Sequence, residues 1–388
     1  MDTNDLKKNR WRILAAIILI VVIVLSLFFD FENLSTEDSM TAILQIFDAI
    51  LSETTPASAL STLPTLPSTT LSPSEPETNN TISTIDGMMT VHFIDVGQSD
   101  ATLFVHNGEV MLFDAAMASR GDELVSYIKN LGINHIDVLV LTHPHDDHMG
   151  GAAELLSNIP VDVIYGPDIF EIMDPEYNTS VSDDGSKTSV SKKTPGWYED
   201  MLNEIDYIDA KQNENIPEDE QTSIWHFPRN ENGEFAKFNI GGAVVEFLAP
   251  LEDYYTDKND YSICAKITYG EIDFIMTGDA TTSVEYALLT EGYNLDAEIF
   301  QASHHGSDTS NSREFLEAMT PEAVVISCGM KNRYNHPVKS VLNLYKDLGV
   351  IVYRTDEAGN IILTTDGTTY SFNTEPGTYT SGAEYKAG

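Results

Sequence analysis

The longest apolar run of the chain lies close to its N-terminus, over residues 13–29, and Ser26 is its single polar residue. This length is at the short end of what an α-helix needs to cross a bilayer. Trp11 stands where an interfacial anchor would lie, and four basic residues precede the run: Lys7, Lys8, Arg10 and Arg12. The pattern predicts a transmembrane anchor with residues 1–12 in the cytoplasm and the rest of the chain extracellular. A cleaved signal peptide fits the same pattern and would also export the rest.

Residues 30–87 are rich in serine, threonine and proline, with scattered acids. Such a composition cannot bury enough apolar surface to fold, so we predict a disordered stalk that holds a folded domain away from the membrane. The folded domain is expected to span residues 88–373, and residues 374–388 to form a C-terminal tail.

Short apolar runs at the start of this domain predict strands at 91–96, 101–105, 110–113 and 136–141. The dipeptide Asn107-Gly108 is typical of a tight hairpin turn. Apolar positions at helical spacing follow Asp122 and stop at Gly132. Residues 167–242 lose this order and predict an insertion with a helix at 196–208, which either covers a neighbouring site or is a neutral surface addition.

The second half of the domain repeats this plan. Strands are predicted at 244–248, 262–269, 272–277, 299–302, 324–328 and 350–353, and helices at 313–319 and 338–348. Thr282 to Glu285 is typical of a capping box that opens a further helix, and Asn311 with Glu314 looks like another. A last hairpin turns at Asp366-Gly367. Hairpins followed by alternating strands and helices, twice over, favour an α/β fold with two sheets face to face and helices outside.

Acidic residues greatly outnumber basic ones, 61 against 21, which gives a net charge of −40. Removing the four basic and two acidic residues before the apolar run leaves 17 basic and 59 acidic residues. Proteins that grip a nucleic-acid backbone usually present lysine and arginine in excess, so tight binding of DNA is disfavoured. Cys264 and Cys328 lie in predicted strands, and the sequence leaves open whether they pair.

Candidate chemistry follows the strand at 136–141, in the segment 142–150, which reads Thr-His-Pro-His-Asp-Asp-His-Met-Gly. In an extended loop His143 and His145 point the same way, and Asp147 and His148 follow where the chain turns into a helix. Imidazole and carboxylate suit zinc and related divalent ions. Three of the ten histidines lie in this one segment, which favours a ligand role over chance.

The spacing His143-x-His145-x-Asp147-His148 resembles the signature of the metallo-β-lactamase superfamily. Four further motifs occur in the order seen in the hydrolase domain of ComEC-type competence proteins and their stand-alone relatives. They are Phe-Ile-Asp-Val-Gly-Gln-Ser-Asp-Ala at 93–101, Met-Thr-Gly-Asp at 276–279, His-His-Gly-Ser at 304–307 and Asn-Arg-Tyr-Asn-His-Pro at 332–337. The resemblance covers about residues 88–373 and implies a four-layer αββα sandwich with a site along one edge between the sheets.

The resemblance also implies a centre for two divalent metal ions, zinc or alternatively manganese. The implied ligands are His143 and His145 at the first ion, Asp147, His148 and His305 at the second, and Asp279 between them. Adjacent residues of an extended chain point apart, so one of His304 and His305 is expected to bind metal, and we expect His305. His304 and His336 are expected on the substrate side, although His336 could instead cap a helix. Asp147, His304 and His336 are the predicted catalytic residues.

One position departs from the superfamily pattern. Many members supply another histidine before the strand that leads to Asp279, and this chain has Asn-Asp-Tyr-Ser at 259–262, which ComEC-like sequences resemble. The first metal site is then short of a ligand, which water, Asp260 or substrate could provide. Asp95 and Asp114, at strand ends, are expected to orient the ligating histidines.

Two neighbouring cations lower the pKa of a shared water and stabilise the charge of an in-line displacement. We therefore predict an exported, membrane-tethered metallo-hydrolase that uses metal-bound hydroxide, with phosphodiester hydrolysis as the leading reaction. A small or cell-wall phosphoester substrate is favoured over tightly bound DNA, and no protein partner can be inferred. Hydrolysis of a lactam, lactone or thioester is the second hypothesis, and a non-catalytic metal-binding surface module is the third.

Overall fold

A computed structural model describes residues 87–173, 179–181, 187–189, 194–214, 216–217, 221–230 and 232–387 of the chain. All of them belong to one unit, Pro76–Gly388. The predicted membrane anchor and residues 30–86 of the predicted stalk lie outside the described residues. Within the described ranges, no helix is long and apolar enough to cross a membrane.

The first sheet is mixed and has eight strands. In spatial order they are β17 (Tyr370–Phe372), β16 (Ile361–Thr365), β1 (Met89–Phe93), β2 (Thr102–His106), β3 (Glu109–Phe113), β4 (Ile136–Val140), β5 (Val161–Tyr165) and β8 (Trp225–His226). The strands from β17 to β3 pair antiparallel, and those from β3 to β8 pair parallel. Asn107 and Gly108 both have positive φ, so the predicted turn joins β2 to β3. The last hairpin, β16–β17, returns to lie beside β1.

The second sheet is also mixed and has seven strands. In order they are β15 (Ile351–Arg354), β14 (Ala323–Ile326), β13 (Ile299–Gln301), β12 (Ile272–Met276), β11 (Cys264–Tyr269), β10 (Ala243–Ala249) and β9 (Lys237–Ile240). The predicted strand 324–328 ends early, at Ile326, because the Ser327 carbonyl and the Cys328 amide bond to side chains rather than to a strand. Cys264 and Cys328 are both buried and free.

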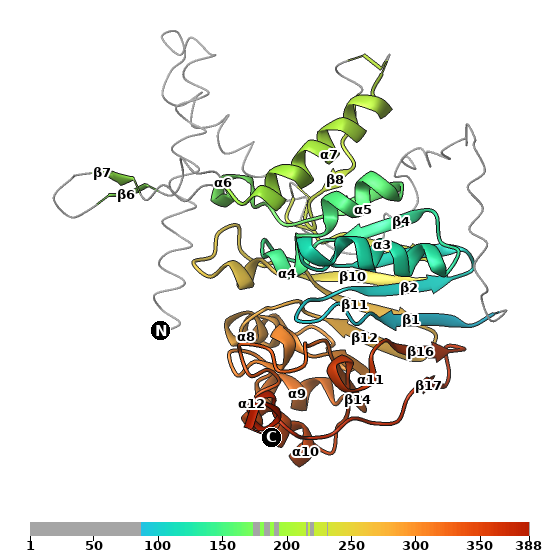
Figure 1. The fold of residues 1–388 in the computed structure, drawn as a ribbon, viewed down its shortest axis with the longest axis vertical. Helices are drawn as coiled ribbons and strands as arrows, with labels where there is room; N and C mark the ends of the chain where they lie inside the picture. The colour runs from blue at the N-terminus through green and yellow to red at the C-terminus, as the bar shows by residue number, and fades with distance from the viewer. Residues whose placement is uncertain are drawn as a thin grey trace, which may run out of the picture. The chain divides into compact units, whose positions relative to one another are not determined.

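Helices cover the outer faces of both sheets (Figure 1). Against the first sheet lie α3 (Gly121–Asn130), α5 (Ala152–Asn158) and α7 (Gly196–Gln212), and against the second lie α8 (Thr282–Glu291), α9 (Arg313–Met319) and α10 (Lys339–Leu348). Short helices occupy the loops: α4 (Asp146–Met149), α6 (Phe170–Met173), α11 (Thr355–Ala358) and α12 (Gly382–Ala387).

Buried side chains form three clusters that separate these layers. On β2, Phe104 faces the cluster between the two sheets, whereas its neighbours Leu103 and Val105 face the helices. On β12, Phe274 faces the same inter-sheet cluster and Ile275 faces the helices of the other side. Because neighbouring strand residues point to opposite faces, each sheet is buried on both. This arrangement agrees with the predicted α/β sandwich.

The predicted insertion is partly built into the fold. The helix expected at 196–208 is α7, which extends to Gln212 and buries Met201 and Ile205. The insertion also supplies β8 to the first sheet and β9 to the second. A separate two-stranded ribbon pairs β6 (Thr179–Val181) with β7 (Lys187–Ser189).

The residues assigned from sequence to a C-terminal tail bond to the second half of the domain. The Gly377 amide donates to the Val352 carbonyl over 2.7 Å. The buried Arg354 side chain donates to the Thr380 carbonyl, and Lys339 pairs with Glu384 of α12 at 3.0 Å. These contacts place α12 beside the loop that carries His336, where the Gly382 amide donates to the Pro337 carbonyl.

Candidate metal centre

The candidate site lies where three strands of the two sheets end. His143 to His148 follow β4, Asp279 follows β12, and His304 and His305 follow β13. Gly278 is where the two sheet edges meet: its φ is +50°, and a Cβ there would lie 2.8 Å from Thr142 Oγ1. Only glycine allows this approach at low cost. Beyond it the Asp279 amide donates to Ser262 Oγ over 3.1 Å, which points the carboxylate into the site.

His148 is fully buried and is held by Asp114. Its Nδ1 donates to Asp114 Oδ2 over 2.7 Å, and the same carboxylate accepts from the amide and hydroxyl of Thr142 at 2.8 and 2.9 Å. Since Nδ1 carries the proton of that bond, Nε2 is the atom left to face the site. It lies 3.1 Å from Asp279 Oδ1 without hydrogen-bond geometry. The predicted orienting role of Asp114 therefore has the required contact.

His143 is held in a similar way by its neighbour. The Thr142 hydroxyl gives its proton to Asp114, so it can only accept from His143 Nδ1, 3.1 Å away. The His143 Nε2 atom then faces the site, 3.0 Å from His145 Nδ1 and 3.7 Å from Asp279 Oδ2. Two ring nitrogens that approach this closely suit two ligands of one ion.

His304 and His305 lie in a left-handed turn, with φ values of 52° and 55°. We expected the two residues to lie in extended chain and so to point apart. That geometry was wrong, because both residues have the left-handed backbone conformation. His305 is nevertheless the buried one: its Nδ1 donates to the Ser327 carbonyl over 2.9 Å, and its Nε2 lies 3.6 Å from Asp147 Oδ2. His304 is partly exposed, with Nε2 3.4 Å from Asp279 Oδ2.

Two overlapping groups of these side chains face the site, one of His143, His148 and Asp279 and one of Asp147, His148 and His305. A third group, Asp100, Asp114 and His148, lies on the Nδ1 side of His148. Within each group the candidate ligand atoms lie within 4.8 Å of one another. The buried atoms without a hydrogen-bond partner include three candidate ligand atoms: Asp279 Oδ1, His148 Nε2 and His305 Nε2. Buried polar atoms are rarely left unpaired, so the donor set fits divalent metal ions.

The electrostatics of the site match this assignment. Burial alone would raise the pKa of Asp279, but His148 and His305 outweigh it and hold that pKa well below its ordinary value. Burial lowers the pKa of His143 well below its usual value, so this ring is neutral, the form that binds metal. For His148, burial is outweighed by Asp279 and Asp114, which raise its pKa. The carboxylates thus stabilise positive charge in the site, and a divalent ion would supply such a charge.

The predicted substrate-side residue His336 lies beside the two other histidines. Its ring centroid is 5.6 Å from that of His304 and 6.3 Å from that of His305, nearly parallel to the latter. Burial, together with the charges of His305 and His304, lowers its pKa to about 4. It does not cap a helix, because Val338 is the N-cap of α10.

Two carboxylates expected to serve the centre lie elsewhere. Asp95 is exposed and accepts from the amide of Gly97, within its own turn, so the prediction that it orients a histidine was wrong. Asp260 accepts from the amide and hydroxyl of Thr281 at the start of α8 and belongs to neither group of candidate ligands, so it does not complete the first metal site.

Asp100, and not Asp95, is the acid of this motif that lies beside the centre. It is buried, with Oδ1 3.6 Å from His305 Nδ1 and Oδ2 3.9 Å from His148 Nδ1. Its amide donates to the Asp147 carbonyl over 3.1 Å, which ties it to the loop of ligands. Its place in the motif at 93–101 was the only signal of this position in the sequence.

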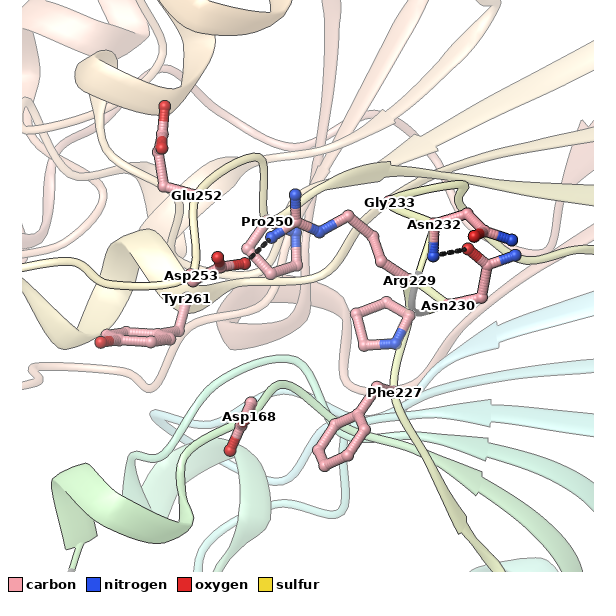
Figure 2. A pocket seen from close by; sticks show the side chains of 11 residues that line it. Asp168, Phe227, Arg229, Asn230, Asn232, Gly233, Pro250, Glu252, Asp253 and Tyr261 are labelled. Carbon is pink, nitrogen blue, oxygen red and sulfur yellow. Dashed lines mark hydrogen bonds and ion pairs between the residues drawn. The ribbon is translucent and has the colours of Figure 1, made fainter. Parts of the chain in front are cut away.

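A cavity of about 550 Å³ opens at the same edge of the sandwich (Figure 2). Three of its lining residues come shortly after strands: Asp168 after β5, Phe227 after β8 and Pro250 after β10. Arg229 points to Asp253 there and pairs with it at 2.6 Å. None of the described residues that line the cavity belongs to the two groups of candidate metal ligands.

Comparison with known proteins gives matches over most of the described domain. The model of the Metallo-beta-lactamase superfamily matches residues 94–330. ComE operon protein 3 of Bacillus subtilis is 25% identical over 290 residues, which cover 70% of this chain and 32% of that protein. Competence protein ComA of Neisseria gonorrhoeae is 27% identical over 269 residues, covering 68% and 30%. The chain thus spans about a third of the length of these relatives, and the resemblance to ComEC-type proteins is confirmed.

Among solved structures, the metallo-beta-lactamase fold protein YhfI from Bacillus subtilis aligns with a TM-score of 0.42 and 11% identity, covering 71% of this chain and 100% of that one.

Proposed function

Because the chain belongs to the metallo-beta-lactamase superfamily and gathers two neighbouring groups of candidate metal ligands, we propose that it is a metal-dependent phosphodiesterase. The observation that carries the proposal is the place of the Asp279 carboxylate between the two groups: Oδ2 lies 3.7 Å from His143 Nε2, and Oδ1 lies 3.1 Å from His148 Nε2 and 3.9 Å from His305 Nε2. A carboxylate can offer one oxygen to each of two ions, whereas His148 has only Nε2 available and can bind one. Two ions, for which zinc is our first choice, would supply Lewis acidity, activate water and stabilise the charge of an in-line displacement.

The side chains divide into those that would hold the ions and those that would meet the substrate. His143, His145, His148, Asp147, Asp279 and His305 would hold the ions. His304 is partly exposed next to Asp279, and its Nδ1 is bonded to Thr309 Oγ1 at 3.0 Å, so Nε2 is the atom available to a substrate oxygen. His336, whose pKa is low, would meet the same oxygen as a neutral ring.

The test is hydrolysis of bis(p-nitrophenyl) phosphate by the full chain with zinc, manganese or a chelator. We expect turnover that depends on metal and that is lost in Asp279→Asn but kept in Lys129→Gln, a change on α3 at the opposite edge of the sheet. Metal that binds without any turnover of the diester would refute the proposal. Turnover of a chromogenic cephalosporin instead would select the lactam reaction.

We also propose that the domain acts outside the cell, tethered by residues 13–29. The apolar run and its basic flank support this orientation. Added protease should then remove the domain from intact cells, and a domain that is degraded only after lysis would contradict the proposal.

The net charge of −40 favours small diesters or local segments of a polymer over long, tightly bound DNA. Activity on long polyanions should therefore rise as added salt screens the acidic surface. Strong processive cleavage at low salt would contradict this electrostatic reasoning.

A further inference from the structure

The loop that carries His336 is unusual in so acidic a chain. Between Glu322 and Asp347 the sequence has no acidic residue at all. Lys331 and Arg333 lie exposed in this stretch, and no carboxylate of the described residues pairs with either of them. Cations that no described carboxylate neutralises, at the margin of a candidate site, are available to an anionic ligand.

Asn332 holds this loop in one shape. Its buried amide donates to the carbonyls of Gly329 and His336 over 2.8 and 2.6 Å, and its Oδ1 accepts from the amides of Tyr334 and His336, both at 3.1 Å. The Gly329 amide donates to Gln98 Oε1 over 3.0 Å, which joins the loop to the motif at 93–101. A loop fixed in this way binds a ligand without first losing conformational freedom.

A column of rings leads from the surface of this loop to the metal centre. The exposed Tyr334 ring stacks on His336 with centroids 5.5 Å apart, and His336 in turn stacks on His305 at 6.3 Å. The Arg333 guanidinium lies 4.6 Å from the Tyr334 ring centroid, and its Nη2 donates to the Tyr334 hydroxyl. From α12, Lys386 donates to Asn335 Oδ1 over 2.8 Å and brings a third cation to the same loop.

The opposite side of the metal centre has the reverse charge. In the second sheet, β14 and β10 lie on opposite sides of β12 and β13, whose ends carry the candidate ligands. The cavity beyond β10 is lined by Asp168, Glu252 and Asp253 (Figure 2), and its Arg229 is already engaged by Asp253 and by the Leu251 carbonyl. An additional anionic group of a substrate would therefore be repelled on the β10 side and attracted on the β14 side.

We propose that Lys331 and Arg333 bind a second phosphate of the substrate, next to the diester held at the metal centre. This inference rests on the proposed phosphodiesterase function and specifies its preferred substrates, which are diesters that carry a further phosphate. Stacked on Tyr334, the planar guanidinium is pre-oriented for the paired hydrogen bonds that arginine makes with phosphate oxygens. Lys331 would add a point charge.

The experiment compares two dinucleotides that differ by one group, TpT and its terminally phosphorylated form pTpT. For the full chain we expect a KM about tenfold lower for pTpT than for TpT, as two exposed charge contacts of ordinary strength would give. Lys331→Gln/Arg333→Gln should abolish this ratio by raising the KM for pTpT, whereas Lys129→Gln should preserve it. A glycerol phosphodiester with and without a terminal phosphate tells whether the phosphate alone is recognised.

Binding measured by calorimetry in the Asp279→Asn background separates this inference from the proposed function. If the natural chain hydrolyses no diester but pTpT still binds more tightly than TpT in the Asp279→Asn background, and Lys331→Gln/Arg333→Gln loses the difference, the phosphate site stands and the proposed reaction fails. If both dinucleotides are hydrolysed and bound alike, the phosphate site is refuted and the phosphodiesterase remains. A ratio that persists in the double variant also refutes the assignment to Lys331 and Arg333.

Discussion

Asp114 and Asp95 offer a direct test of how the metal centre is supported, because both stand at strand ends but only Asp114 contacts a ligand. Both oxygens of Asp114 accept hydrogen bonds: Oδ1 from the Thr142 amide, and Oδ2 from the Thr142 hydroxyl and His148 Nδ1. In Asp114→Asn, an amide group at the Oδ1 position would meet the Thr142 N–H. If the amide group instead stands at the Oδ2 position, it donates to His148 Nδ1, which must then accept. The ring proton moves to Nε2, the atom that faces the metal.

Either orientation weakens metal binding. Loss of such an orienting carboxylate costs about 10- to 100-fold in metal affinity, which is about 1.4–2.7 kcal/mol. We expect the upper half of this range, because Asp114 is buried and no solvent can replace the lost acceptor.

The apparent zinc affinity can be measured by competition with a chromophoric chelator, with circular dichroism as the check on folding. Asp95→Asn is the matched control and should stay within about twofold of the natural protein, since surface changes away from a site have small effects. A folded Asp114→Asn protein with natural affinity would refute the reasoning, and so would an equal loss in Asp95→Asn.

Three further outcomes concern stability. Burial lowers the pKa of the His92 ring to about 4 in the folded protein. In the unfolded chain this histidine binds a proton already near pH 6.5, so the free energy of unfolding falls as the pH drops below about 6.5. From pH 8 to pH 5 the loss is about 2 kcal/mol. Urea unfolding should show this loss in the natural protein and less of it in His92→Gln, and equal pH profiles would contradict the assignment. Gly306→Ala places a Cβ 2.6 Å from that of Pro337 at φ +79° and should cost about 2–4 kcal/mol. Gly349→Ala, at φ +76° with open space, should cost only about 1 kcal/mol, so equal costs would refute the clash. Because metal binds the folded state alone, chelation should lower the melting temperature, by several degrees if the ion is held at 100 times its Kd or more. That shift should be small in Asp279→Asn, and an undiminished shift would place the metal elsewhere.

Much of the fold could be predicted because strands and turns leave local signals. Short apolar runs marked most strands, and the dipeptide Asn107-Gly108 marked a hairpin. The site loops were found for the same reason: His143, Asp279 and His304 each come shortly after an apolar strand. The return of β16 and β17 to the first sheet had no such signal, because pairing between strands far apart in the chain is decided by tertiary packing.

Carboxylates were harder to assign than histidines. Asp95 and Asp100 stand in one motif, and nothing local tells which of them turns inward; the chain buries Asp100 and leaves Asp95 in a surface turn. The predicted capping boxes failed similarly. The cap of α8 is Thr281, and Glu285 instead accepts from the amides of Asn311 and Ser312 over 2.6 and 2.9 Å. A capping pattern predicts a bond within one helix, but this buried carboxylate bonds to the start of α9.

The residues that orient the ligands come from the strands next to those that carry them. Asp114 follows β3, the parallel neighbour of β4, and holds His148. Ser327 follows β14, the parallel neighbour of β13, and its carbonyl holds His305. Ser262 precedes β11, which runs antiparallel to β12, and holds the Asp279 amide. Parallel strands end, and antiparallel strands begin, at the same sheet edge, so strand order alone brings each orienting group beside its ligand. The pairing of neighbouring strands therefore builds the support of the centre together with its ligands, and a change that shifts one of these registers should disturb metal binding without altering any ligand.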